Sequence, residues 1–487
     1  MPFSAAVLAL LLAALLLAVG WRLHARIHTA KDFELARRRL PDRIAGISQA
    51  VNSIPMWLSF ALAALAYSVG LAALWAALAN MLGMVINWWL IAPRLREYTA
   101  ASDSDSLTEW FAASAGDKLQ ATTVRSAGAI VSIALILASL TALQWAGAQL
   151  AALADVGFVF AVTMIGIVLL VVLLLGGFWS ASVADVIQAG LGALLIVVVA
   201  AGAWHGLAHP GTFAMQLRQH EPANGAWFAG YSGVLALSLS VGMMFAALGA
   251  TPQPHVVVRY LACRDQAAVR HARRLALGWS AIVLGGSLSV GWCARVMLGG
   301  AALGDSFDGR ALLAALSAQT LSAWFAMAVA FAMSAIFALS CLSLWMSAAI
   351  HLASIFSGRP QASTLMRQRV AVAVVVATAF VGAVYLPKGS EDRLWFCWQS
   401  LSAAFGPLLL VRLTGKRVRP GSSLGAMWSG FILTLLFHLM PETPGDLLER
   451  SLPFIASLGI ALSGGDQRRN PDRADRGDKT VHDHLPI

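Results

Sequence analysis

Long apolar runs separated by short polar stretches dominate this chain, and the pattern predicts membrane-spanning helices. A helix that crosses a bilayer needs about 20 mostly apolar residues. Thirteen runs are candidates, all but the short last one near or above that length, at residues 3–21, 45–67, 71–92, 127–150, 156–175, 179–203, 229–250, 276–299, 319–355, 370–387, 394–411, 422–440 and 452–464. The first run is longer than the apolar centre of a signal peptide and has no basic residue before it, so we expect it to be retained. The sequence therefore predicts an all-α polytopic membrane protein with about 13 transmembrane helices.

The polar stretches between these runs differ in charge. If the N-terminus lies outside, the cytoplasmic stretches hold 28 of the 34 Lys and Arg residues and the outer ones hold five. Basic loops stay in the cytoplasm, so this asymmetry predicts an N-out/C-in chain with an odd number of crossings. It also accounts for the net charge of +10 without a nucleic-acid partner.

The composition agrees with this interpretation. The chain is 59% hydrophobic and 12% charged, whereas soluble domains are about 45–50% apolar and about 25% charged. We expect one transmembrane domain over residues 1–465. Residues 466–487 are polar, carry both charge signs and lack apolar periodicity, which is typical of a disordered cytoplasmic tail.

The sequence offers little enzyme chemistry. It contains no P-loop, nucleophile elbow, HExxH or Rossmann fingerprint, and its four cysteines are far apart with no CxxC pair. Two histidine pairs, at 205/209 and 482/484, are more simply interfacial or solvated than metal-binding. We therefore expect no enzyme activity, no metal site and no cofactor.

Two of the apolar runs contain residues that interrupt a helix. Pro55 lies in "AVNSIPMW", where it removes a hydrogen-bond donor and frees the carbonyl of Val51. The seventh run ends in "SVGMMFAALGATPQPH", which has two glycines and two prolines. Irregular backbone within a membrane is tolerated only beside a cavity or inside protein. Interrupted helices at matching places in two halves are the best sequence pointer to a transporter's binding site. Their separation by five spans predicts a five-plus-five inverted repeat, about residues 45–203 and 229–411.

Ionisable residues inside the apolar runs are few. Asp185 lies in "GGFWSASVADVIQ", with Gln188 three residues later on the same helical face. Such groups are costly in a membrane and are candidates for function. Asp155 fits a solvated turn, and Arg295 can extend toward the outer surface.

Several blocks of the chain resemble the solute/sodium symporter family, in family order from about residue 31 to 440. They are "DFELARRRLPDRIAGISQAVNSIPMW", "INWWLIAPRLREYT", "GGFWSASVADVIQAG", "QPHVVVRYLACRDQAAVRHARR", "LSCLSLWMSAAI" and "AAFGPLLL". The resemblance implies a LeuT-like inverted-repeat fold and sodium-coupled uptake of a small organic solute, an amino acid such as proline or a carboxylate. It also implies a multi-pass protein of the bacterial inner (plasma) membrane.

The resemblance assigns roles to individual positions. Coupling or gating falls on Arg38, Asp185 and Gln188. Sodium would be held by the backbone carbonyls of Val51 and Ile54 and by two hydroxyl positions that are Phe337 and Ala338 here. The family's carboxylate in the broken second span falls on Ser53, and its substrate-site aromatic residues fall on Ser139, Ala246 and Ala250. The expected substrate pathway therefore comprises Gln49, Asn52, Ser53, Pro55, Ser139, Gln144, Ala246 and Ala250.

Sodium is a hard cation that needs several oxygen ligands, and this chain has lost two hydroxyls and a carboxylate. We therefore expect a secondary transporter whose sodium dependence is weak or absent. The alternative is a degenerate transporter that acts as a solute sensor or with a separate signalling partner, and a membrane enzyme is a weaker third. Flux across a sealed membrane separates the first two.

Overall fold

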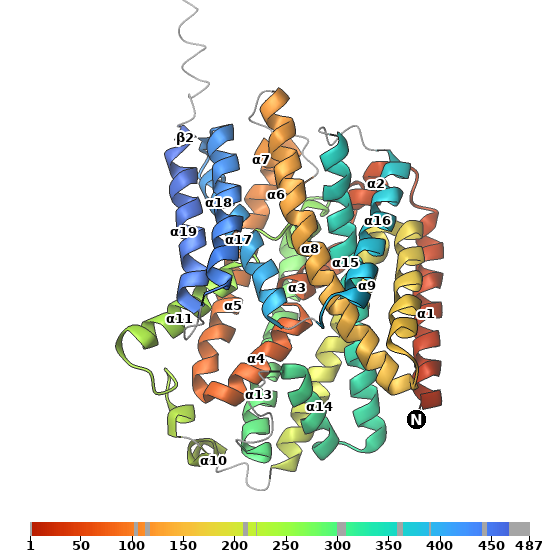
Figure 1. Ribbon diagram of the computed structural model, residues 1–487, viewed down its shortest axis with the longest axis vertical. Coiled ribbons are helices and arrows are strands. Elements are labelled where there is room, and N and C mark those ends of the chain that lie inside the picture. Colours follow the sequence, from red (N-terminus) through yellow and green to blue (C-terminus); the bar gives the residue numbers. More distant parts are fainter. Residues whose placement is uncertain are drawn as a thin grey trace, which may run out of the picture.

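The computed structural model describes residues 2–101, 106–112, 117–207, 213–220, 222–299, 308–357, 364–388, 391–440 and 446–466. This part of the chain is almost wholly helical (Figure 1). Two short strands, β1 (Arg417–Val418) and β2 (Gly465–Asp466), pair antiparallel. The expected tail lies outside the described residues from 467 onward.

The first half of the chain contains the first predicted break. Its elements are α1 (Pro2–His24), α2 (Ala30–Leu35), η1 (Ala36–Arg38), α3 (Asp42–Ser53), α4 (Met56–Val69), η2 (Gly70–Ala73), α5 (Leu74–Ile86), the π-helical turn η3 (Asn87–Ile91), α6 (Ala92–Ala101), α7 (Leu107–Ala112), α8 (Asp117–Ala154) and α9 (Phe158–Gly206). The expected break at Pro55 is confirmed, because α3 ends two residues before it and α4 begins immediately after it.

The second half contains the other predicted break, between α11 and α12. Its helices are α10 (Phe213–His220), η5 (Pro222–Gly225), α11 (Gly233–Leu248), α12 (Pro254–Leu261), α13 (Gln266–Leu298), α14 (Gly309–Thr320), α15 (Ala323–Ser357), α16 (Leu365–Tyr385), α17 (Glu391–Leu413), α18 (Pro420–His438) and α19 (Leu447–Ser463). The expected ninth span, 319–355, begins later than predicted. Its first two residues end α14, and α15 begins as a separate helix at Ala323.

Nine helical stretches within the described residues are long and apolar enough to cross a membrane. One of them, α9, has 49 residues and bends back at Gly177, where φ is 50° and ψ is −134°. One of the nine stretches joins α4, α5 and α6 over Met56–Thr99, and α3 and α12 are too short to be among the nine, so the expected count of 13 stays a prediction. The protein is therefore a nearly all-helical, multi-pass membrane protein.

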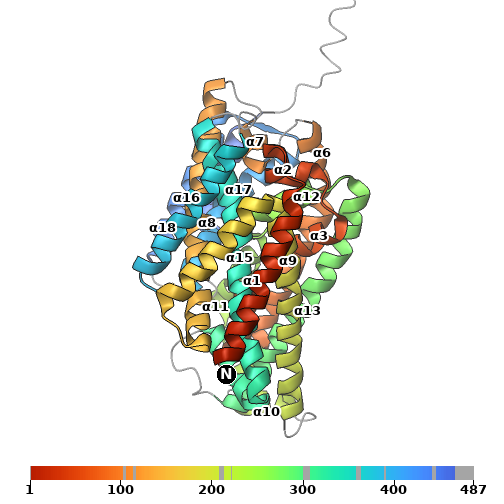
Figure 2. The same ribbon diagram turned by 90° about the vertical axis from the view of Figure 1, so that its right-hand side faces the viewer.

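The N-terminus and β2 lie at opposite ends of the helix bundle (Figure 1), as an odd number of crossings requires. Figure 2 shows α1 running beside α9 on the outside of the bundle. The broken helix is held deeper inside, where α3 packs on α9 and α13. Gly46 permits this contact, because a Cβ there would lie 2.3 Å from the carbonyl oxygen of Ala272 on α13. Small residues allow such close helix–helix approach in membranes.

Candidate solute site

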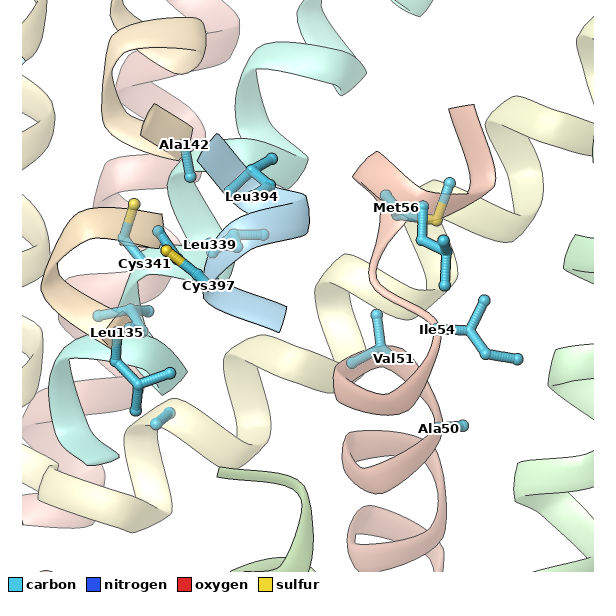
Figure 3. Packing of buried hydrophobic residues seen from close by; sticks show 14 of the residues in the cluster. Ala50, Val51, Ile54, Met56, Leu135, Ala142, Leu339, Cys341, Leu394 and Cys397 are labelled. Atoms are coloured by element: carbon cyan, nitrogen blue, oxygen red, sulfur yellow. The ribbon is translucent and has the colours of Figure 1, made fainter. Parts of the chain in front are cut away.

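The break between α3 and α4 leaves backbone groups without helical partners. The N–H of Ile54 makes the last α3 bond, to the carbonyl of Ala50 at 2.9 Å. Pro55 has no N–H to give to Val51, four residues before it. No side chain caps the start of α4, whose first N–H groups have no partner within the helix. Figure 3 shows the extended chain at this break, with Val51 before it and Met56 after it.

A small cavity lies beside the break, bounded by α3, α4, α8, α9, α12, α15 and α17. Its volume is about 50 Å³, whereas ligand pockets are commonly about 300–1,000 Å³. Leu135 and Ala142 of α8, and Leu394 and Cys397 of α17, lie across from the break (Figure 3). The structure therefore shows a nearly closed state that must widen to hold an organic solute.

The cavity wall is mostly apolar and aromatic. The rings of Trp57 and Trp398 meet edge to face at 5.9 Å, and those of Trp145 and Phe337 at 5.0 Å. The guanidinium of Arg310 on α14 lies over the Trp145 ring at 3.9 Å. No Asp, Glu, Lys or Arg is among the described residues that line the cavity. Its polar side chains are Asn52, Gln188, Gln253, His255 and Ser340.

Two of these polar side chains have an unpaired atom. The amide nitrogen of Gln253 donates to the carbonyls of Gly249 and Trp398, each at 2.9 Å. Its Oε1 atom has no hydrogen-bond partner among the described residues, and neither has Nδ1 of His255. Both side chains are buried. Buried polar groups are normally paired, so these two atoms lack the partner that is usual for such groups.

A buried ion pair lies next to the cavity. Asp185 of α9 and Arg259 of α12 are 0% and 1% exposed, and Nη2 of Arg259 lies 3.1 Å from Oδ2 of Asp185. Asp185 also accepts hydrogen bonds from Ser48 at 2.5 Å, from Asn52 at 2.9 Å and from Ser343 at 2.7 Å. These contacts join α3, α9, α12 and α15. Asn52 belongs both to this network and to the cavity wall.

The expected pathway residues divide into two groups. Asn52 and Pro55 line the cavity, as do Val51 and Phe337 from the expected cation positions and Gln188 from the coupling group. Ile54 and Ala338 are outside that lining. Asp185 is outside the lining too, but it accepts a hydrogen bond from Asn52, which is part of it.

The other expected pathway residues make contacts elsewhere. Gln49 accepts from the Trp88 indole at 2.9 Å and donates to Ser53 at 2.7 Å. The hydroxyl of Ser139 donates to the Ile136 carbonyl at 2.8 Å. Their assigned roles, like those of the residues that follow, stay predictions.

The remaining positions lie in α8, in or after α11, and at the end of η1. Gln144 donates to the carbonyls of Ala383, Leu386 and Pro387 at 3.1–3.2 Å, and Arg38 donates to the Thr99 carbonyl at 3.4 Å. Ala250 is buried after α11. Ala246 falls within α11, and its side chain lies outside the described part.

The side chains at the expected cation positions do not suit sodium. Phe337 packs its ring against Trp145 and Phe60, with centroids 5.0 and 5.7 Å away. Neither Phe337 nor Ala338 has a side-chain oxygen, and the nearby carboxylate of Asp185 is paired with Arg259. A hard cation needs more oxygen ligands than the carbonyls of the break supply.

Sequence reasoning missed Gln253, His255, Arg259 and the tryptophans of the wall. One signal was available, because a carboxylate such as Asp185 within a membrane normally pairs with a cation. Arg259 follows the seventh apolar run, 229–250, so the charge pattern places it in a cytoplasmic connection and hides this partnership.

Comparison with known proteins agrees with this architecture. The sodium:solute symporter family profile matches residues 33–432. The sodium/proline symporter of Staphylococcus aureus is 24% identical over 421 residues, covering 83% of this chain and 80% of that protein. A substrate-bound, outward-open Na+-coupled sialic acid symporter superposes with a TM-score of 0.72 at 16% identity, covering 94% of this chain and 97% of the other. A nucleobase-cation-symport-1 transporter in a closed conformation gives 0.54 at 13% identity, covering 88% and 92%. At these identities the superpositions support the fold alone, which is the expected LeuT-like class.

Proposed function

This chain belongs to the sodium:solute symporter family, and from that premise we propose that it moves a small organic solute across the membrane by alternating access. The observation that carries the proposal is the cavity beside the α3–α4 break, where main-chain groups and unpaired side-chain atoms meet. Irregular backbone survives at membrane depth where it lines such a cavity.

The solute is an amino acid such as proline, or a related carboxylate. The start of α4 presents N–H groups and the positive end of a helix dipole, which suit a carboxylate. The Gln253 Oε1 atom accepts a hydrogen bond, which suits an ammonium or amine. The relative from Staphylococcus aureus that carries the name sodium/proline symporter supports the same class.

Sodium dependence of this transport is weak or absent. The support is the composition of the expected cation positions, where Phe337 and Ala338 contribute no oxygen, and the pairing of Asp185 with Arg259. The bacterial relatives favour a place in the bacterial inner (plasma) membrane.

Uptake by proteoliposomes tests the proposal. We expect radiolabelled proline, or another member of a panel of amino acids and carboxylates, to accumulate faster than in empty liposomes. Replacing an inward sodium gradient by choline should leave the rate almost unchanged. A strong increase with the sodium gradient would refute the coupling part. Solute binding without flux would favour the sensor alternative, for which we find no supporting contact or relative.

A further inference from the structure

A groove of about 520 Å³ lies between α1, α9 and α16, away from the solute cavity. Apolar side chains of α9 and α16 form most of its wall, among them Val171, Leu174 and Val370. The described lining residues that are polar are both basic, His24 at the end of α1 and Arg369 near the start of α16. Val171 and Val370 are 38% and 54% exposed, so the groove opens to the outside of the bundle, where lipid lies.

The basic residues of the groove lie at the cytoplasmic side of the membrane. The N-terminus is outside, and α1 runs from it toward the end of the bundle where β2 lies (Figure 1). Nδ1 of His24 donates to the carbonyl of Leu175 at 3.2 Å, two residues before the turn at Gly177 in α9. Arg369 is the fifth residue of α16, which packs on α9. The groove therefore meets the headgroup region of the cytoplasmic leaflet.

The three helices bring almost no negative charge to the groove. Neither α1 nor α16 contains an Asp or Glu, and the single carboxylate of α9, Asp185, is buried in its own ion pair. Asp32 on the neighbouring α2 is paired with Arg37 at 2.6 Å. Arg26, just after α1, adds another guanidinium, 4.8 Å from the Trp179 ring of α9. This end of the three helices should therefore attract an anion.

Arg369 supplies a donor that has no partner within the described part of the protein. Its Nε atom is buried and makes no hydrogen bond there. Buried donors are normally paired, and the planar fork of an arginine matches a phosphate group. The residue also lies one turn into α16, near the positive end of the helix dipole. Both features suit a phosphate at this side chain.

We propose that the groove binds a phospholipid with an anionic headgroup, whose phosphate lies at Arg369 and His24 and whose acyl chain follows the apolar wall of α9 and α16. Basic pockets between transmembrane helices on the cytoplasmic side bind such headgroups. A free phosphate ion would satisfy Arg369 but would leave the apolar wall uncovered. The lipid joins α1 and α9 to α16 beside the turn at Gly177. The inference does not depend on the proposed transport function.

The test uses the purified full-length chain, delipidated in an uncharged detergent. Dioleoyl phosphatidylglycerol is the anionic probe, and dioleoyl phosphatidylcholine has the same acyl chains but no net charge. Native mass spectrometry should show at least one phosphatidylglycerol retained on each chain. Phosphatidylglycerol should also raise the Tm by about 3 °C or more above the value in phosphatidylcholine, because a ligand that binds only the folded state stabilises it.

Three variants and a control locate the lipid. Arg369→Gln changes a partly buried side chain and should retain about fivefold less phosphatidylglycerol, since one basic group near an anionic surface contributes about 1 kcal/mol. Arg369→Lys keeps the charge and should retain more lipid than Arg369→Gln. Ala373→Trp fills the groove and should reduce retention of both lipids. The control is Arg264→Gln, since Arg264 is 79% exposed and its partner is the surface residue Asp265 at 3.0 Å.

Several results would overturn the inference. Equal retention of phosphatidylglycerol by the wild type and Arg369→Gln contradicts the headgroup position, and equal Tm values in the two lipids contradict an anionic ligand. Inorganic phosphate at matched ionic strength should leave the Tm unchanged, and a gain as large as that from phosphatidylglycerol would replace the lipid by a free anion. If Arg369→Gln does not fold, Ala373→Trp decides, because undiminished retention by that variant places the lipid elsewhere.

Discussion

The turn at Gly177 should be among the least tolerant positions of the fold. Its φ of 50° with ψ of −134° bends α9 back on itself, in a region that side chains disfavour by about 1–3 kcal/mol. A Cβ at this position would lie 2.7 Å from Cδ2 and 2.8 Å from the carbonyl oxygen of Phe33. Relieving such overpacking costs about 1–3 kcal/mol more. Gly177→Ala should therefore destabilise the protein by about 2–6 kcal/mol in all.

Gly190 provides a matched control on the same helix. It is exposed, no atom lies within 4 Å of a Cβ built there, and alanine is the better helix former by about 1 kcal/mol. Monodisperse yield and Tm in detergent should fall for Gly177→Ala and stay level or rise for Gly190→Ala. Uptake should follow, because the turn leads directly into Phe178, whose ring lies 5.4 Å from the Arg259 guanidinium. Equal Tm values for the two variants would refute the steric reasoning.

Three other perturbations test the site. Ala142→Phe adds a ring to a cavity of about 50 Å³ and should abolish uptake with a modest loss of Tm. The control Ala148→Phe, on the exposed side of α8, should leave uptake intact. Similar uptake by both variants would exclude this cavity as the route. Pro55→Ala supplies an N–H that can occupy the Val51 carbonyl, so uptake should fall while Tm is kept or raised. Pro420→Ala is the control, because Pro420 is the first residue of α18 and an N–H there would have no carbonyl partner within the helix. Equal uptake by the two proline variants would argue against a functional break. Exchange of sodium for choline should change proline uptake by less than a factor of about two, since no side-chain oxygen at positions 337 and 338 completes a cation shell.

The breaks in the helices could be predicted because their cause is local. Pro55 removes its own N–H wherever the chain goes, and the glycines and prolines after α11 act in the same way. The apolar runs at 3–21, 127–150 and 370–387 also coincide with single helices, α1, α8 and α16, since hydropathy depends on neighbouring residues alone. The separation of α14 from α15 is less visible in the sequence, because residues 309–320 form a helix outside the apolar run.

The contents of the site depend on distant contacts and could only partly be predicted. Asp185 and Arg259 are 74 residues apart, and nothing in either segment specifies the other. The helical spacing of Asp185 and Gln188 suggested one shared face. In the structure Gln188 lines the cavity, while Asp185 meets Ser48, Ser343 and Arg259 at its edge. Residues three apart on a helix are neighbours on its surface, yet the side chains of Asp185 and Gln188 contact different partners.

Asn52 makes the solute cavity and the ion pair energetically dependent on each other. Its amide donates both to Asp185 and to the carbonyl of Ser48, and its side chain also forms cavity wall. Widening the cavity at Asn52 would therefore disturb its hydrogen bond to Asp185. Breaking a buried pair costs about 3–5 kcal/mol, whereas micromolar binding releases about 8 kcal/mol. A solute bound with micromolar affinity would therefore release enough free energy to separate Arg259 from Asp185, provided that the open state binds the solute more tightly than the closed one by at least the cost of the pair.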